Sequence, residues 1–101
     1  MRMLLKFELG LAATNEAIRN GTMAEINEQL AATTKPEAAY FGTESGRRTG
    51  YIVFDLEDPA RIPVIAEPLF QGVGATVEFI PVMTTEDLQR GLAEAAGSRE
   101  P

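Results

Sequence analysis

The 101-residue sequence contains no cysteine and no histidine. Without cysteine there is no disulfide framework, no thiolate nucleophile and no cysteine metal site. Histidine is the side chain that most often acts as a general base near neutral pH, and it is the commonest metal ligand. Its absence excludes serine–histidine hydrolysis, histidine-ligated haem and histidine zinc sites, so any proton transfer must use Asp, Glu, Lys or Tyr.

Three other patterns are missing. No apolar run approaches the roughly 20 residues of a membrane span, and residues 1–7 are too short for the apolar part of a signal peptide. The net charge is −6 and the nine basic residues are scattered, whereas nucleic-acid binding needs clustered Lys and Arg. Gly72 and Gly74 follow a helix and precede a strand, the reverse of a dinucleotide site. We therefore expect no cofactor and no nucleic-acid or membrane partner, with a cytoplasmic location as the default.

What the sequence does contain is an order of periodic segments: strand, helix, two strands, helix, strand. This order predicts a ferredoxin-like α+β sandwich, in which both helices cover one face of a four-stranded antiparallel sheet of order 4-1-3-2. The expected strands are Met3–Glu8, Ala38–Thr43, Arg48–Leu56 and Ala75–Val82, and the expected helices are Thr22–Ala32, Asp58–Phe70 and a C-terminal Thr85–Ala96. Residues 1–96 are expected to form one domain, and residues 97–101 a frayed tail.

Local signals mark the ends of these segments. Thr22–Glu25 and Thr84–Asp87 each have the pattern of a capping box at a helix start. Asp58-Pro59 supplies an N-cap followed by a first-turn proline. Pro68 removes a backbone hydrogen bond and should kink or end its helix. Glu44–Arg47 is expected to be the turn between the second and third strands.

Alternation along the strands separates two faces of the sheet. Met3, Leu5 and Phe7 belong to the face that the helices cover. The other face, which we call the open face, carries Leu4, Lys6, Glu8, Tyr40, Tyr51, Val53, Asp55, Glu78, Ile80 and Val82. Soluble monomers usually avoid leaving such an apolar patch in water. We therefore expect a homodimer in which two open faces pack about a two-fold axis and enclose a partly polar space.

The candidate site lies on this open face. Lys6 on the central first strand is expected between Glu78 of the fourth strand and Asp55 of the third, close enough for cross-strand ion pairs. The carboxylates would keep Lys6 charged, so it would act as an electrostatic anchor for an anionic oxygen rather than as a base. A structural ion pair at the interface is the simpler alternative. Tyr40 and Tyr51 could likewise donate hydrogen bonds to a ligand or fill the interface.

A second pair of candidates precedes the first expected helix. Asn15 and Arg19 lie four residues apart and face the same way on a helical turn, where an arginine could clamp a carboxylate at the mouth of the cavity or order a loop. Gly21 follows them and can break a helix or only weaken it. Whether residues 14–33 form one helix or two is left open by the sequence.

Several strings resemble a family of small uncharacterised bacterial proteins. They are Lys35–Phe41, Ile62-Pro63, Ala66–Pro68 with Phe70, Val77-Glu78, Pro81–Thr84 and Glu86–Leu88. In layout this family is similar to the dimeric α+β barrel superfamily, which includes muconolactone isomerase-like proteins and cofactor-independent monooxygenases. The resemblance implies the fold and the dimer, and it brings no established activity.

Two functions of different class are compatible with these observations. The first is a small-molecule binding protein or cofactor-independent, isomerase- or monooxygenase-like enzyme that takes a small anionic or aromatic compound inside the barrel. Its pocket would be formed by Lys6, Tyr40, Tyr51, Asp55 and Glu78, with Asn15 and Arg19 at the mouth. The second is a non-catalytic homodimeric assembly module, whose open face is entirely consumed by packing. The two differ in whether a cavity of a few hundred cubic ångströms remains.

Overall fold

The computed structural model describes residues 1–97, and its elements follow the expected order. Strands β1 (Arg2–Glu8), β2 (Ala38–Glu44), β3 (Arg47–Asp55) and β4 (Thr76–Pro81) form one antiparallel sheet in the order β2-β3-β1-β4. The helices are α1 (Leu11–Asn20), α2 (Thr22–Thr34), α3 (Arg61–Val73) and α4 (Thr85–Gly97). This is the expected strand order read from the opposite edge, so the ferredoxin-like α+β fold is confirmed. Apart from Gly97, which ends α4, the expected frayed tail lies outside the described residues.

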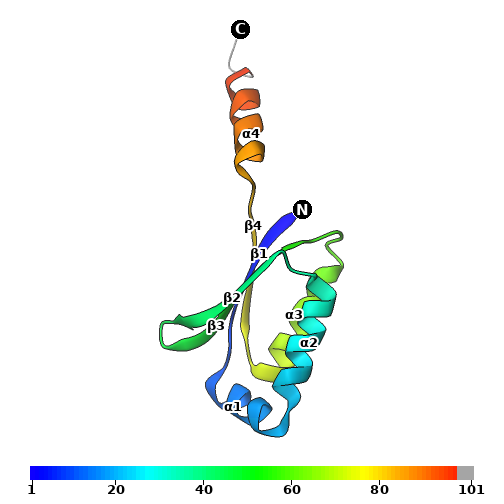
Figure 1. Cartoon of the computed structure of the whole chain (residues 1–101), viewed down its shortest axis with the longest axis vertical. Helices are drawn as coiled ribbons and strands as arrows, with labels where there is room; N and C mark the ends of the chain where they lie inside the picture. Colours follow the sequence, from blue (N-terminus) through cyan, green and yellow to red (C-terminus); the bar gives the residue numbers. More distant parts are fainter. Residues whose placement is uncertain (98–101) are drawn as a thin grey trace.

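The hydrophobic core lies between the sheet and helices α1, α2 and α3, which share one side of it (Figure 1). The alternating β1 residues Met3, Leu5 and Phe7 are all buried, and Phe54 of β3 is buried on the same face. The helices contribute Ala17, Ile26, Leu30, Ile65, Leu69 and Val73. The period-2 pattern in the strands and the 3.6-residue pattern in the helices therefore meet in a single core.

Gly21 separates α1 from α2, which answers the question that the sequence left open. Its φ of 84° lies in the left-handed region, where a residue without Cβ is favoured and an α-helix cannot continue. The Asn20 side-chain oxygen accepts a hydrogen bond from the Thr22 amide at 2.9 Å. The expected capping box at Thr22 is wrong, because Gly21 occupies the N-cap position and no side-chain cap forms there.

The expected N-cap of α3 is also wrong. The Asp58 carboxylate accepts a hydrogen bond from the Ala60 amide at 2.9 Å and builds a turn, so the helix begins only at Arg61. Of the two effects expected at Pro68, a kink or an end of the helix, the end does not occur, because α3 continues to Val73. The lost backbone hydrogen bond is offset because Leu69 and Val73, beyond the proline, are fully buried in the core.

Helix α4 lies apart from the sheet. It continues from β4 along the long axis of the molecule, whose dimensions are 63 × 28 × 19 Å (Figure 1). Its capping box is confirmed: the Thr84 amide donates to Asp87 Oδ2 at 3.3 Å, and the Asp87 amide donates to Thr84 Oγ1 at 3.1 Å. None of its side chains is buried, and Leu88 and Leu92 are 47% and 60% exposed.

Candidate functional site

Strand register brings four of the predicted site residues into one row across the open face. Lys6 lies opposite Tyr51 of β3 on one side and Glu78 of β4 on the other, and Tyr51 lies opposite Tyr40 of β2. We call Tyr40, Tyr51, Lys6 and Glu78 the polar row. Two of its expected features, the central position of Lys6 and its neighbour Glu78, are therefore confirmed.

The partner that binds Lys6 most closely is a residue that was expected in a turn. Glu44, the last residue of β2, forms an ion pair with Lys6, in which Oε2 of Glu44 lies 2.6 Å from Nζ of Lys6. The Tyr51 hydroxyl donates a hydrogen bond to the same carboxylate at 3.1 Å. Extending the alternation of β2 by two residues from Gly42 would have put Glu44 on the open face.

Asp55 does not belong to this site. It lies opposite Arg2, four residues along β3 from Tyr51, and its carboxylate binds the N-terminal ammonium of Met1 at 2.8 Å. Four residues of strand span about 13 Å, which is too far for an ion pair with Lys6. The expected Lys6–Asp55 pair is wrong because the register, which the sequence did not reveal, places the two side chains in different rows.

The three bound groups hold one another in fixed charge states around neutral pH. The hydrogen bond with Glu44 raises the pKa of Lys6 against the opposing effect of desolvation, and the charges of Glu44, Glu78 and Glu8 add to the rise. Hydrogen bonds from Lys6 and Tyr51 lower the pKa of Glu44. Desolvation, followed by the hydrogen bond to Glu44, raises the pKa of Tyr51. The network is thus an ammonium, a carboxylate and a neutral phenol, which can hold an anion or donate a hydrogen bond but offers no base near pH 7.

The same shifts set the pH range of this network. Because the pKa of Glu44 is lower in the folded chain than its ordinary 4.5, its contribution to stability is present above pH 4.5 and is lost as the pH falls through the folded value. Because the pKa of Lys6 is raised above 10.5, its contribution is present below pH 10.5 and is lost as the pH rises through the folded value.

The phenol of Tyr51 gives a direct readout of this network. The chain has two tyrosines and no tryptophan, so tyrosinate absorbance near 295 nm can be followed without interference. In a Tyr40→Phe background, we expect Tyr51 to ionise above its ordinary pKa of 10.0. Adding Glu44→Gln should lower that pKa, because the carboxylate charge and a strong hydrogen-bond acceptor are both removed. The control is Glu57→Gln in the same background, because Glu57 is an exposed loop residue that has no part in the network. This variant should leave the pKa of Tyr51 unchanged. An unchanged titration in Glu44→Gln would contradict the network.

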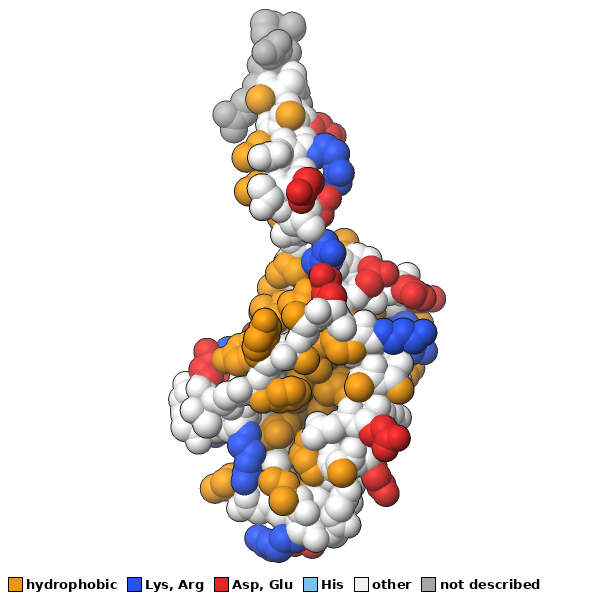
Figure 2. All heavy atoms as spheres, viewed as in Figure 1, with side chains coloured by type: hydrophobic (Ala, Val, Ile, Leu, Met, Phe, Trp, Pro, Cys, Tyr) orange, Lys and Arg blue, Asp and Glu red, His pale blue; other side chains and the backbone are white. Residues whose placement is uncertain are grey.

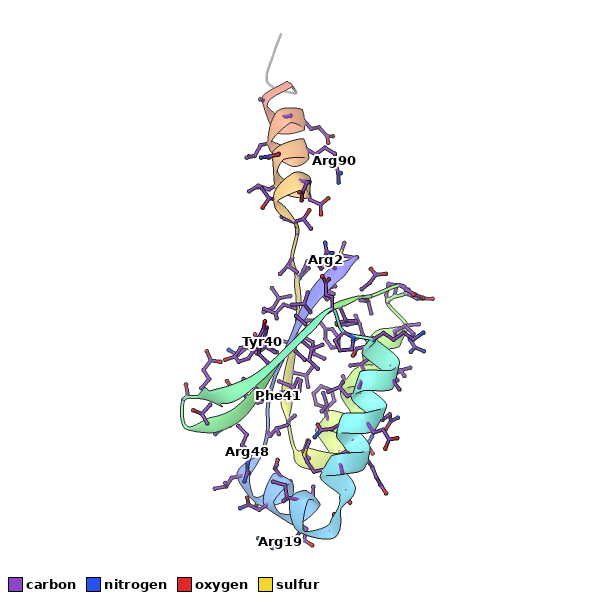
Figure 3. All side chains as sticks on the ribbon, viewed as in Figure 1. Arg2, Arg19, Tyr40, Phe41, Arg48 and Arg90 are labelled. Atoms are coloured by element: carbon purple, nitrogen blue, oxygen red, sulfur yellow. The ribbon has the colours of Figure 1, made fainter. Side chains whose placement is uncertain are left out.

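The structure places Asn15 and Arg19 on α1, away from the polar row, and gives them different partners. Arg19 pairs with Glu16 at 3.1 Å on the exposed surface of α1. The Asn15 side-chain oxygen instead accepts a hydrogen bond at 2.8 Å from Nη2 of Arg48, on β3. Figure 3 shows Arg48 extending from the hairpin towards α1, with Arg19 at the far end of that helix. An arginine beside Asn15 is therefore present, but it comes from 33 positions further along the chain, and no local pattern could have identified it.

Arg48, which Asn15 holds in place, lines a second candidate site on the side of the sheet that the helices cover. A groove of about 450 Å³ lies there between the β2–β3 hairpin and helices α1 and α2, and we call it the helix-side groove. In Figure 2, hydrophobic side chains gather in the hollow between the hairpin and the helices. Within residues 1–97, no three acidic side chains come close enough to hold a metal ion.

Comparisons with known proteins leave function to be argued from this geometry. No family model, no curated protein and no solved structure matches the chain significantly. Within residues 1–97, none of the helices has the length and apolar character needed to cross a bilayer.

Proposed function

We propose that this protein is a homodimeric assembly module whose two subunits pack together through their open sheet faces. The observation that carries the proposal is an apolar row next to the polar row, on the same face. Register places Ala38, Val53, Leu4 and Ile80 side by side across all four strands, and we call this the apolar row. Helices α1–α3 all lie on the other side of the sheet (Figure 1).

The apolar row is suited to a second copy of the same chain. A row that crosses the whole sheet is self-complementary under a two-fold rotation, because each copy presents the same stripe. Ile80 is 37% exposed and Tyr40 is 70% exposed, so burying them would remove apolar surface from water. Within the polar row, Lys6 and Tyr51 are already paired with Glu44, and Glu78 lies on the edge strand β4, where its carboxylate can stay in water at the rim of the interface.

Helix α4 supports the same assembly. Its apolar side chains Leu88 and Leu92 are about half exposed or more, and they share a helix face because they are four residues apart. Met83, just before the helix, is also largely exposed. A 13-residue helix is marginally stable on its own and normally needs an apolar face to be buried. In the dimer that we propose, α4 reaches past its own sheet and packs on the partner.

The alternative function places a ligand inside the dimer. If the two open faces leave a cavity, the polar rows would line it and Lys6 would anchor an anionic or enolate-like oxygen, as in a cofactor-independent enzyme. The Lys6–Glu44–Tyr51 network supports this alternative, since it is a preorganised set of charges at the centre of the sheet. In either case the default location of the protein is the cytoplasm.

The molar mass in solution tests the proposal. Sedimentation equilibrium at about 5–50 µM should give twice the chain mass of 10.9 kDa. In this concentration range, nearly all chains of a stable dimer are paired. A monomer throughout this range would overturn the proposal. A crystal structure of the dimer then separates the two functions: a closed, dry interface means assembly alone, and an enclosed space of a few hundred cubic ångströms beside Lys6 means a ligand site.

A further inference from the structure

The helix-side groove is a concave surface lined mainly by apolar side chains. Its walls come from four elements: Phe7 of β1, Ile18 of α1, Met23 of α2 and Phe41 of β2, with Arg48 at one end. Figure 3 shows Phe41 pointing from β2 towards the space between the hairpin and α2. A volume of about 450 Å³ is in the range of small-molecule sites.

The groove exists because the helices do not extend over the edge strand β2. Phe41 is on the helix-covered side of the sheet, opposite Gly50, and yet it is 67% exposed. Gly50 has no side chain, and the ring of Phe7 occupies the space above it. Phe7, which is 1% exposed, closes the bottom of the groove, and the exposed ring of Phe41 forms one wall.

Arg48 gives this groove a charge. Four basic side chains in residues 1–97 have no ion pair, namely Lys35, Arg47, Arg48 and Arg61, and Arg48 is the one that is partly buried. Its hydrogen-bond partner, the Asn15 amide oxygen, is neutral. That bond orients the guanidinium without cancelling its charge and uses only one of its five N–H donors. A half-buried arginine held by a neutral group is suited to binding a carboxylate through two parallel hydrogen bonds.

We propose that the helix-side groove binds a small organic monocarboxylate with an apolar body. The carboxylate would lie against the free edge of the Arg48 guanidinium, within reach of the hydroxyl of Thr43, which is opposite Arg48 in the β2–β3 register. The apolar body would lie between Phe7, Met23 and Phe41. The groove is on the opposite side of the sheet from the open face, so this site is independent of the proposed dimer interface.

Nuclear magnetic resonance titration of the whole ¹⁵N-labelled protein tests the proposal. Octanoate and 2-naphthoate are the carboxylate probes, one alkyl and one aromatic, and 1-octanol is the uncharged match to octanoate. We expect saturable shifts of the backbone amides of Thr43, Thr49 and Gly50 with at least one carboxylate. Whichever of the two binds more tightly identifies the apolar body as alkyl or aromatic. If octanoate is the better ligand, 1-octanol should bind at least tenfold more weakly than octanoate. If 2-naphthoate is the better ligand, 2-naphthol should bind at least tenfold more weakly than 2-naphthoate.

Three variants separate binding from folding. Arg48→Gln keeps an amide donor for Asn15 and removes the charge, so it should weaken carboxylate binding at least tenfold with the melting temperature nearly unchanged. Arg61→Gln makes the same charge change at an exposed arginine outside the groove, and it should bind as the wild type does. Phe41→Ala should weaken the carboxylate and the alcohol alike, because it removes apolar contact and no charge.

If Arg48→Gln is too unstable to titrate, Arg48→Lys retains the charge and loses the planar fork, and a several-fold weaker affinity is then expected. The proposal is overturned if neither carboxylate causes saturable shifts at millimolar concentration, if the alcohol binds as well as its carboxylate, or if both Arg48 variants bind like the wild type. In those cases Arg48 serves only to tie β3 to α1.

Discussion

Replacing Ile80 with aspartate should convert the proposed dimer into a monomer. Ile80 lies at one end of the apolar row, opposite Leu4, and is 37% exposed in the single subunit. In the dimer its side chain would be buried against the partner, so an aspartate would leave an unpaired charge out of water. Such a charge costs about 3–5 kcal/mol, and since each 1.4 kcal/mol is a factor of ten, the dimer should weaken by about a hundredfold or more.

Sedimentation equilibrium measures the effect directly, and thermal unfolding gives a second readout. A dimer that forms only from folded chains has a melting temperature that rises with protein concentration. That dependence should be present in the wild type and absent in Ile80→Asp, together with a lower melting temperature at high concentration.

Val64→Asp is the matched control for this experiment. Val64 is an aliphatic residue of α3 with 44% exposure, on the helix-covered side of the molecule. Its replacement makes the same kind of chemical change on a surface that the proposal leaves in solvent, so the dimer should persist. A dimeric Ile80→Asp variant, or a Val64→Asp variant that dissociates equally, would contradict the open-face interface.

Replacing Gly50 with alanine should destabilise the fold strongly. A Cβ at this position would overlap with Cζ of Phe7, and that ring is 1% exposed and enclosed by the core. Gly50 has no positive φ, so the backbone itself would accept alanine and the whole cost comes from packing. Overpacking of this kind costs about 2–3 kcal/mol, which corresponds to a fall of roughly 10 °C or more in the melting temperature of a 100-residue domain.

Gly42→Ala is the control, because Gly42 is also a strand glycine with an ordinary φ, and a Cβ there meets nothing within 4 Å. Urea unfolding should show that it differs from the wild type by less than about 0.5 kcal/mol. Adding Phe7→Leu to Gly50→Ala should recover part of the lost stability, since a smaller side chain makes room for the Cβ. Equal stability of Gly50→Ala and Gly42→Ala would contradict the close contact between Gly50 and Phe7.

Local chemistry determined most of the fold. Period-2 alternation in β1 identified Met3, Leu5 and Phe7 as core residues, and the order of segments was enough to predict the strand order. The Thr84–Asp87 capping box formed as expected because both partners lie within one helical turn. Where local signals failed, tertiary burial was stronger. Pro68 does not end α3, because the residues beyond it are held in the core.

The candidate sites depended on tertiary structure to a greater extent. Placing Lys6 on the central strand followed from alternation and topology, but its binding partner Glu44 comes from two strands away and could be identified only once the hairpin length was known. Asp55 was misplaced for the same reason, because a register sets which side chains share a row and no single strand encodes it.

Arg48 shows most clearly where sequence reasoning stops. The pattern at Asn15 and Arg19 suggested an arginine poised for a carboxylate, and the structure places an arginine beside Asn15 that is supplied by β3 instead of α1. The sequence by itself determined which segments are strands and helices and which faces are apolar, because those depend on spacings of two to four residues. Only the tertiary structure decided which polar side chains meet, since partners such as Asn15 and Arg48 are 33 residues apart and are brought together by the packing of a helix against a sheet.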